Sequence, residues 1–143
     1  NLAGYRAAFV VGDPALIVQI LEVRKHAGMM VPLPVQKAMI VALSDSDHVA
    51  EQRARYNARK ATLVPALTDA GFTIDHSEAG LYLWATRGED CWKSVEWLAK
   101  LGFLATPGMF NGENGSRHIR IAMTATDKQI GDATARIQEA IAG

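Results

Sequence analysis

Apolar and polar positions repeat with a helical period over the first half of the chain and alternate as in strands over the second half. Residues 7–11 form a short apolar run that ends at Gly12, a pattern typical of a buried strand. Residues 14–26 and 35–43 are predicted helices. Asp13 and Pro14 favour the start of the first helix, because aspartate caps free N–H groups and proline suits the first turn. A rigid apolar connector containing Pro32 and Pro34 lies between them.

A longer helix is predicted over residues 48–70, after the capping cluster at residues 44–47. Its first half is polar, so we expect it to be largely solvated and to bridge two domains. Pro65 lies inside it and should kink or divide it. The predicted division is therefore residues 1–45, a linking helix at residues 46–71 kinked near Pro65, and a small domain at residues 72–143.

The last part of the sequence changes to short alternating runs. Strands are predicted at residues 72–75, 81–86, 103–105 and 118–123, and a glycine-rich loop at residues 107–115. A helix is predicted at residues 90–101. Thr126 and Gln129 form a capping box that begins the final helix. The fold class is thus α/β, with a compact α+β module at the carboxy-terminal end.

Composition excludes several classes of protein. The 143 residues contain 15 basic and 15 acidic side chains, which gives a net charge of zero. The sequence has no basic stripe of the kind that binds nucleic acid or an anionic membrane surface. No apolar run is long enough to cross a bilayer. Cys91 is the only cysteine, so no disulfide framework or zinc cluster is expected, and a cytoplasmic location fits. We predict no metal site.

Two arginines are candidates for binding anions. Arg120 lies mid-strand between isoleucines, and the alternation places it with His118 and Ala122 on the opposite face from them. That face is either simply exposed or a ligand site. Arg6 stands between a short polar loop and an apolar run, and a guanidinium there could clamp a phosphate or remain an ordinary surface charge.

Other residue types predict packing. Trp84, Trp92 and Trp97 are expected in the core or between domains, and Cys91 is expected to act as a small hydrophobic residue on a helix face. His48, His76 and His118 are scattered along the sequence and show no catalytic pair.

The run Asn-Leu-Ala-Gly-Tyr-Arg at residues 1–6, followed by small residues and Gly-Asp-Pro, resembles the segment after the cofactor-binding lysine of fold-type I (class I/II) pyridoxal-phosphate aminotransferases. The resemblance covers essentially the whole chain. It implies that residues 1–45 are the tail of the large cofactor-binding domain. The family pattern Ser-x-x-Lys, seven residues, then arginine places the Schiff-base lysine upstream of Asn1, so no catalytic residue is expected in this chain and it should be inactive alone.

The resemblance also implies functional roles. Arg6 would bind the phosphate of pyridoxal 5'-phosphate, and Arg120 would bind the substrate α-carboxylate; Arg117 is the rival position for the second role. Amino acids and 2-oxo acids would be the substrates. A homodimer would be the assembly, with the connector at residues 26–34 near its interface.

Three segments, residues 24–32, 77–86 and 120–127, look like the actinobacterial type of N-succinyldiaminopimelate aminotransferase. This resemblance implies amino transfer from N-succinyl-LL-diaminopimelate to 2-oxoglutarate in diaminopimelate and lysine biosynthesis. Aspartate, an aromatic amino acid or another small amino acid is the alternative substrate. A different kind of alternative is that the isolated fragment is a non-catalytic folding and dimerisation unit.

Overall fold

A computed structural model describes residues 3–143 of the chain. Asn1 and Leu2, which begin the predicted Arg6 motif and the first predicted domain, lie outside the described residues. The chain divides into two compact units, one up to Val49 and one from Ala50 to Gly143.

The first unit is helical. A short 3-10 turn, η1 (Ala3–Tyr5), precedes helices α1 (Pro14–His26) and α2 (Leu33–Ser44). Oδ1 of Asp13 accepts hydrogen bonds from the backbone N–H groups of Ala15 and Leu16, at 2.8 and 3.2 Å. The predicted cap therefore forms, and both predicted helices are confirmed.

The strand predicted at residues 7–11 does not form. This segment has no regular secondary structure, and Phe9, Val10 and Val11 are exposed. A strand needs a neighbour to complete its hydrogen-bond ladder. Within residues 3–143, all strands of the one sheet lie beyond residue 72 and none pairs with this run. The apolar pattern of residues 7–11 indicates that the segment can be buried, but it does not show whether a neighbouring strand is present to pair with it.

Helix α3 (Asp47–Asp69) is continuous through Pro65, so the proline does not divide it. A proline removes one backbone hydrogen bond from a helix. Here its neighbours Leu63, Ala66 and Leu67 are fully buried, and their packing holds the turn together. The predicted assignment of residues 46–71 as an interdomain link, and of the parts on either side as domains, stays a prediction.

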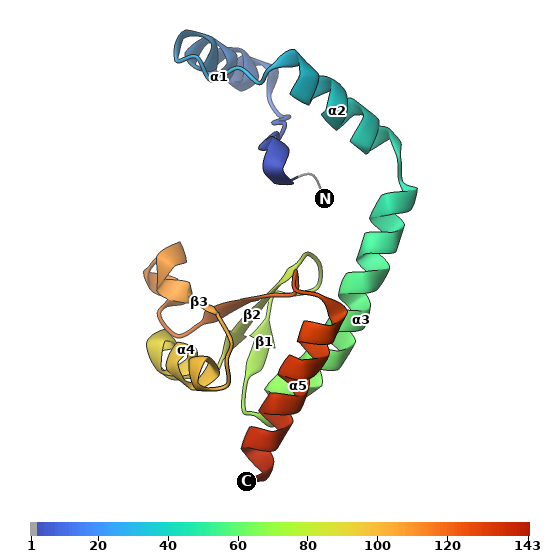
Figure 1. Cartoon of the computed structure of the whole chain (residues 1–143). Helices are drawn as coiled ribbons and strands as arrows, with labels where there is room; N and C mark the ends of the chain where they lie inside the picture. Colours follow the sequence, from blue (N-terminus) through green and yellow to red (C-terminus); the bar gives the residue numbers. More distant parts are fainter. Residues whose placement is uncertain (1–2) are drawn as a thin grey trace. The chain divides into compact units, whose positions relative to one another are not determined.

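The second unit contains a four-stranded antiparallel sheet in the order β1 (Thr73–Asp75), β2 (Tyr82–Thr86), β4 (Ile119–Ala122), β3 (Thr106–Pro107) (Figure 1). The strand predicted at residues 103–105 is displaced to β3. The reason is register: Thr106 pairs with Arg120 and Pro107 with Ile119, whereas the side chain of Leu104 is 99% exposed.

Three helices supply the core on one side of this sheet: the second part of α3, α4 (Cys91–Lys100) and α5 (Asp127–Ala142). In Figure 1, α5 lies beside the second part of α3. The buried cluster is formed mainly by Leu63, Leu67, Phe72, Leu83, Leu98, Ile119, Ile121, Ile130 and Ile137. The predicted α+β module is confirmed. Within the second unit, the three helices cover one face of the sheet, and the other is called the open face below.

The capping box of α5 forms as predicted. The Thr126 hydroxyl accepts from the backbone N–H of Gln129, and the Gln129 side chain accepts from the backbone N–H of Thr126. Thr134 interrupts the apolar stripe of this helix, but it is buried and its hydroxyl donates to the Ile130 carbonyl at 2.9 Å. A buried hydroxyl that is hydrogen-bonded in this way costs little.

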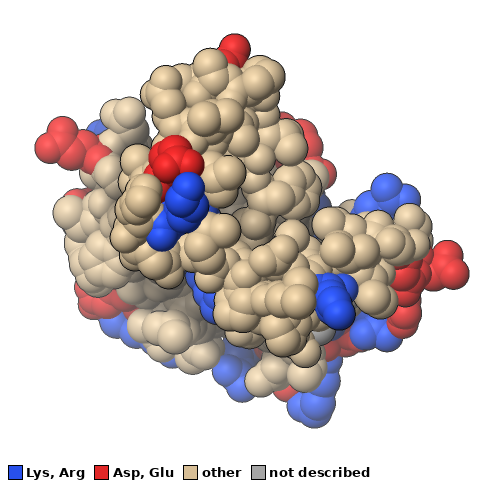
Figure 2. Space-filling model, turned by 90° about the horizontal axis from the view of Figure 1, so that it is seen from above, with Lys and Arg blue, Asp and Glu red and all other residues tan. Residues whose placement is uncertain are grey.

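Uncharged residues cover most of the face drawn in Figure 2. On the face drawn in Figure 2, lysines and arginines lie near aspartates and glutamates in small groups, separated by uncharged residues. In the described part of the chain, no helix combines the length and apolar character that a membrane crossing requires.

Candidate functional site

Arg120 stands in the middle of the open face of the sheet. Along β4, Ile119 and Ile121 are buried in the core, Arg120 is half-buried and Ala122 is exposed. The predicted alternation is therefore confirmed. Trp84 on β2 and Thr106 on β3 are the paired neighbours of Arg120 on its two sides. A central strand thus presents a guanidinium group from a rigid position.

Tyr82 lies against this guanidinium. The guanidinium carbon of Arg120 is 4.5 Å from the centroid of the Tyr82 ring, which is cation–π distance. Among residues 3–143, no aspartate or glutamate lies within ion-pair distance of Arg120, and none of its side-chain N–H groups makes a hydrogen bond. The positive charge is therefore supported by an aromatic face and is not neutralised, an arrangement suited to receiving an anion.

A second row of side chains extends the open face beyond Arg120. Nε2 of His118 lies 3.0 Å from Oδ2 of Asp75, and the imidazole stacks on the Trp84 ring at 5.1 Å with 5° between the planes. Nδ1 of His118 is buried and has no hydrogen-bond partner in the described part of the chain. The sequence placed His118 on the face of Arg120, but it gave no sign of Asp75, which is 43 positions away.

The loop after β3 is held tightly against this face. The N–H of Gly108 donates to the His118 carbonyl at 2.7 Å. A Cβ atom at Gly108 would lie 2.4 Å from the carbonyl oxygens of Gly115 and His118 and 2.7 Å from the Trp84 ring. Only glycine permits so close an approach of two backbones. The glycine-rich segment is therefore packed beside the arginine and the tryptophan.

Arg117, the rival to Arg120, occupies a different environment. It lies in an exposed turn before β4, and its carbonyl accepts a hydrogen bond from the Thr86 hydroxyl at 2.5 Å. Its side chain does not belong to the paired positions of the sheet, so the structure gives it no fixed neighbours comparable with Tyr82 and Trp84.

Arg6 directly follows the 3-10 turn of the first unit. Its N–H donates to the Ala3 carbonyl at 3.2 Å, and its backbone has a φ of 51°, in the left-handed region. That conformation is uncommon for a residue with a Cβ atom and often marks a functional position. The side chain is exposed, and within residues 3–143 its guanidinium makes no hydrogen bond or ion pair.

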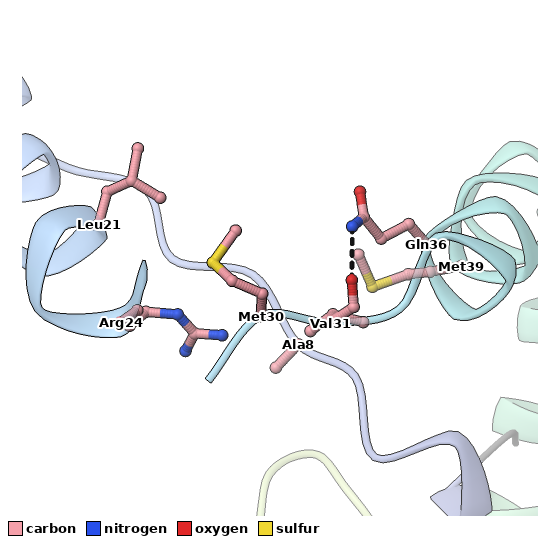
Figure 3. A pocket seen from close by; sticks show the side chains of 7 residues that line it. All are labelled: Ala8, Leu21, Arg24, Met30, Val31, Gln36 and Met39. Atoms are coloured by element: carbon pink, nitrogen blue, oxygen red, sulfur yellow. Dashed lines mark hydrogen bonds between the residues drawn. The ribbon is translucent and has the colours of Figure 1, made fainter. Parts of the chain in front are cut away.

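The predicted connector borders a hollow in the first unit (Figure 3). Two hydrogen bonds hold its backbone: Arg24 donates to the Met29 carbonyl at 2.6 Å, and Gln36 donates to the Val31 carbonyl at 2.7 Å. The hollow is lined by Ala8, Leu21, Arg24, Met30, Val31, Gln36 and Met39. The Arg24 and Gln36 side chains thus donate hydrogen bonds to the backbone of the connector, and the other residues that line the hollow are apolar.

The cysteine and the tryptophans that are predicted to pack lie in different environments. Cys91 is fully buried as a free thiol. Trp97 packs against the core and Phe72, whereas Trp92 is half-exposed and contacts Phe110 edge-on. Over the described residues, no group of three histidine, cysteine, aspartate or glutamate side chains could hold a metal ion.

The family model of aminotransferase class I and II matches residues 1–137 of this chain. Three relatives each align with 96% of it: the "Probable aminotransferase" of Mycobacterium tuberculosis at 57% identity, 4-dedimethylamino-4-oxo-anhydrotetracycline transaminase of Streptomyces rimosus at 58%, and LL-diaminopimelate aminotransferase of Oleidesulfovibrio alaskensis at 35%. The alignments cover 33%, 38% and 36% of those proteins. The chain therefore spans about a third of the length of the relatives it matches.

A solved aminotransferase from Staphylococcus aureus has the same fold as this chain. The match has a TM-score of 0.82 at 26% identity and covers 99% of this chain and 39% of that one.

Proposed function

This chain belongs to the class I and II aminotransferases, and we propose that its protein transfers an amino group from an amino acid to a 2-oxo acid with pyridoxal 5'-phosphate as cofactor. The observation that carries the proposal is the environment of Arg120: a guanidinium fixed on a central strand, backed by Tyr82 and without an acidic partner within residues 3–143. Such a group fits the carboxylate that amino acids and 2-oxo acids share.

Arg6 is the proposed phosphate ligand. The five N–H donors of a guanidinium match phosphate geometry, and those of Arg6 make no bond within the described residues. Its left-handed backbone conformation is an independent sign that the position is constrained for a purpose. The residues present thus fit the cofactor's phosphate group. When bound, pyridoxal phosphate supplies an electron sink that stabilises negative charge at the substrate α-carbon.

The proposed roles of the two arginines are positional. Arg6 would anchor the phosphate and thereby fix the cofactor. Arg120 would hold the substrate α-carboxylate, orienting the α C–H bond for proton removal. Both roles use permanent charges, because arginine stays protonated over the whole physiological pH range.

For the substrate pair we propose N-succinyl-LL-diaminopimelate as amino donor and 2-oxoglutarate as acceptor. Support comes from the three sequence segments that look like that type of enzyme and from relatives named LL-diaminopimelate aminotransferase. A competing proposal has equally specific support: a relative at 58% identity is named for an oxo-anhydrotetracycline, a bulky ring ketone. Aspartate or an aromatic amino acid is the remaining alternative.

We further propose a homodimer that functions in the cytoplasm in amino-acid biosynthesis. Large apolar side chains are exposed on both helices of the first unit, including Leu16, Val18, Ile20, Leu21, Val23, Leu33, Ile40, Val41 and Leu43. Apolar surface of this extent calls for a covering partner, which is either the rest of the protein, of which this chain spans about a third, or a second subunit. Sedimentation of the intact protein over a concentration series would test this, and a persistent monomer would contradict it.

The function is tested by loading the purified intact protein with pyridoxal phosphate and following the cofactor's visible absorption while amino donors are added one at a time. Loss of the band with N-succinyl-LL-diaminopimelate, and its recovery with 2-oxoglutarate, is the expected result. A response only to LL-diaminopimelate, aspartate, an aromatic amino acid or an aminotetracycline would keep the reaction and replace the substrate. No cofactor binding and no response to any donor would refute the proposal and favour a non-catalytic unit.

A further inference from the structure

We propose that Tyr82 is a positioning residue for Arg120, whose ring fixes the guanidinium while leaving its N–H groups available to a carboxylate ligand. The inference rests on the proposed function and deepens it, because it states what prepares the binding arginine before the substrate arrives.

Strand register explains how the two side chains meet. Trp84 is the paired neighbour of Arg120, and Tyr82 is paired with Ala122, two positions further along β4. Tyr82 is thus diagonal to Arg120 on the same face, and long side chains can reach across that diagonal. The 4.5 Å separation of the guanidinium carbon from the ring centroid shows that they do.

The contact between Arg120 and Tyr82 determines which hydrogen-bond donors of the guanidinium remain free. A guanidinium donates hydrogen bonds in its own plane, so a protein carboxylate that stabilised Arg120 would occupy the same donors as the ligand. An aromatic ring attracts the cation through its face and accepts none of those hydrogen bonds in competition. An aromatic ring therefore stabilises the guanidinium without occupying the N–H groups that would bind a carboxylate.

Two other arginines of the second unit provide an internal comparison. The Arg59 guanidinium lies 5.7 Å from the Tyr56 ring and also pairs with Asp127 at 2.6 Å. Arg87 lies 4.9 Å from the Trp97 ring and is 3.5 Å from Glu89. Both combine a ring with an acidic side chain. Among the arginines for which the described residues show a ring contact, Arg120 has the ring alone.

The experiment compares Tyr82→Leu with Tyr82→Phe in the cofactor-loaded intact protein. Tyr82→Leu leaves the Arg120 guanidinium in place, so a carboxylate that has bound is still oriented by it, and what the substitution lowers is the affinity for the carboxylate. Tyr82→Leu should therefore raise KM for amino donor and 2-oxo acid by about 3- to 30-fold with little change in kcat. Tyr82→Phe retains the ring and should recover most of that loss. An unchanged KM in Tyr82→Leu, or an equal loss in both variants, overturns the inference.

Tyr56→Leu is the matched control, because it makes the same substitution at a partly buried tyrosine whose ring contacts another arginine. It should lower the melting temperature and leave KM unchanged. If Tyr56→Leu raised KM as much as Tyr82→Leu, the effect would be general loosening and the inference would be wrong. Should Tyr82→Leu not fold, Tyr82→Met removes the ring with an unbranched, more adaptable side chain and is judged by the same criteria.

Arg120→Lys separates this inference from the proposed function. If Arg120→Lys raises KM and Tyr82→Leu does not, the inference alone fails. If neither substitution changes KM, Arg120 is not the carboxylate ligand and the proposed site fails as well. If Tyr82 acts through Arg120, adding Tyr82→Leu to Arg120→Lys should raise KM by less than it does in the unchanged protein. An equal further increase would show that the tyrosine acts independently and would overturn the inference.

Discussion

Nε of Arg59 lies 2.6 Å from Oδ1 of Asp127, a carboxylate 68 positions later in the first turn of α5. The same guanidinium donates to the Met123 carbonyl at 2.9 Å, directly after β4. One side chain of α3 therefore holds the segment that runs from the Arg120 strand into the last helix. The Arg59 side chain is only 12% exposed, whereas that of Asp127 is 77% exposed, so the bond to the Met123 carbonyl is the one that is partly shielded from water.

Removing this anchor should destabilise the second unit. Replacing Arg59 with methionine leaves the Met123 carbonyl without its donor and should lower the free energy of unfolding by about 1–3 kcal/mol. Arg55→Met is the control one helical turn earlier, where an exposed pair with Glu51 should contribute about 0–1 kcal/mol. Urea unfolding of the two variants measures the difference. Equal losses would show that Arg59 is no more than a surface charge.

Two glycines should respond in opposite directions to the same substitution. Gly108→Ala forces a Cβ atom against two backbone oxygens at 2.4 Å, so unfolding should become easier by about 1–3 kcal/mol. Gly131 is exposed inside α5 with nothing within 4 Å of an added Cβ, so Gly131→Ala should stabilise by about 0.5–1 kcal/mol. Thermal melting of both variants is the test. A neutral Gly108→Ala would mean that the loop can move away at no cost.

Arg120 and Arg117 can be distinguished by kinetics. Arg120→Ala should raise KM and lower kcat together, with a loss in kcat/KM equivalent to about 2–5 kcal/mol, because a desolvated carboxylate would lose its partner. Arg117→Ala changes an exposed turn and should remain within about twofold in kcat/KM. Steady-state rates with a fixed donor and acceptor decide between them. A severe defect in Arg117→Ala beside near-normal Arg120→Ala would transfer the carboxylate role to the turn.

Asp132 should titrate below its ordinary value. A hydrogen bond from Lys128, with the attraction of that charge and of Arg136, lowers the pKa of Asp132 from 3.8. Because the folded-state pKa is the lower one, the pair stabilises the fold above the unfolded value, and this stabilisation is lost as pH falls through the folded pKa. Carboxyl NMR titration should show Lys128→Met moving the pKa of Asp132 upward. No movement would mean that the pair does not persist in solution.

Local signals in the sequence predicted most of the elements of the fold. The Asp13 cap, the capping box at Thr126 and the alternation around Arg120 each depend on residues a few positions apart, and each forms. Contacts between distant positions could not be read in this way. The pairing of His118 with Asp75 connects β1 with the residue just before β4, 43 positions later in the sequence.

Helix α3 shows the same limit for charged residues. Arg59 and Lys60 lie in a polar stretch that the sequence predicts to be solvated. Instead, Arg59 bonds to Met123 and Asp127, and Lys60 donates to the Ser77 carbonyl. A basic side chain has the same pattern in sequence whether its partner is water or a carbonyl brought close by the fold. The partner is decided by packing, here by the burial of Leu63 and Leu67 on the adjoining face.

The left-handed backbone at Arg6 sets stability and activity against each other at one position. Glycine adopts a φ near 51° without strain, so Arg6→Gly should remove about 1 kcal/mol of conformational strain from the folded chain. Part of this gain is offset, because glycine also gives the unfolded chain more conformational freedom. The same change removes every side-chain donor that a phosphate could use. A mutant library selected only for folding would therefore tolerate or enrich glycine at this position. If Arg6 binds the cofactor phosphate as proposed, a library selected for growth that requires the activity of the whole protein would retain arginine.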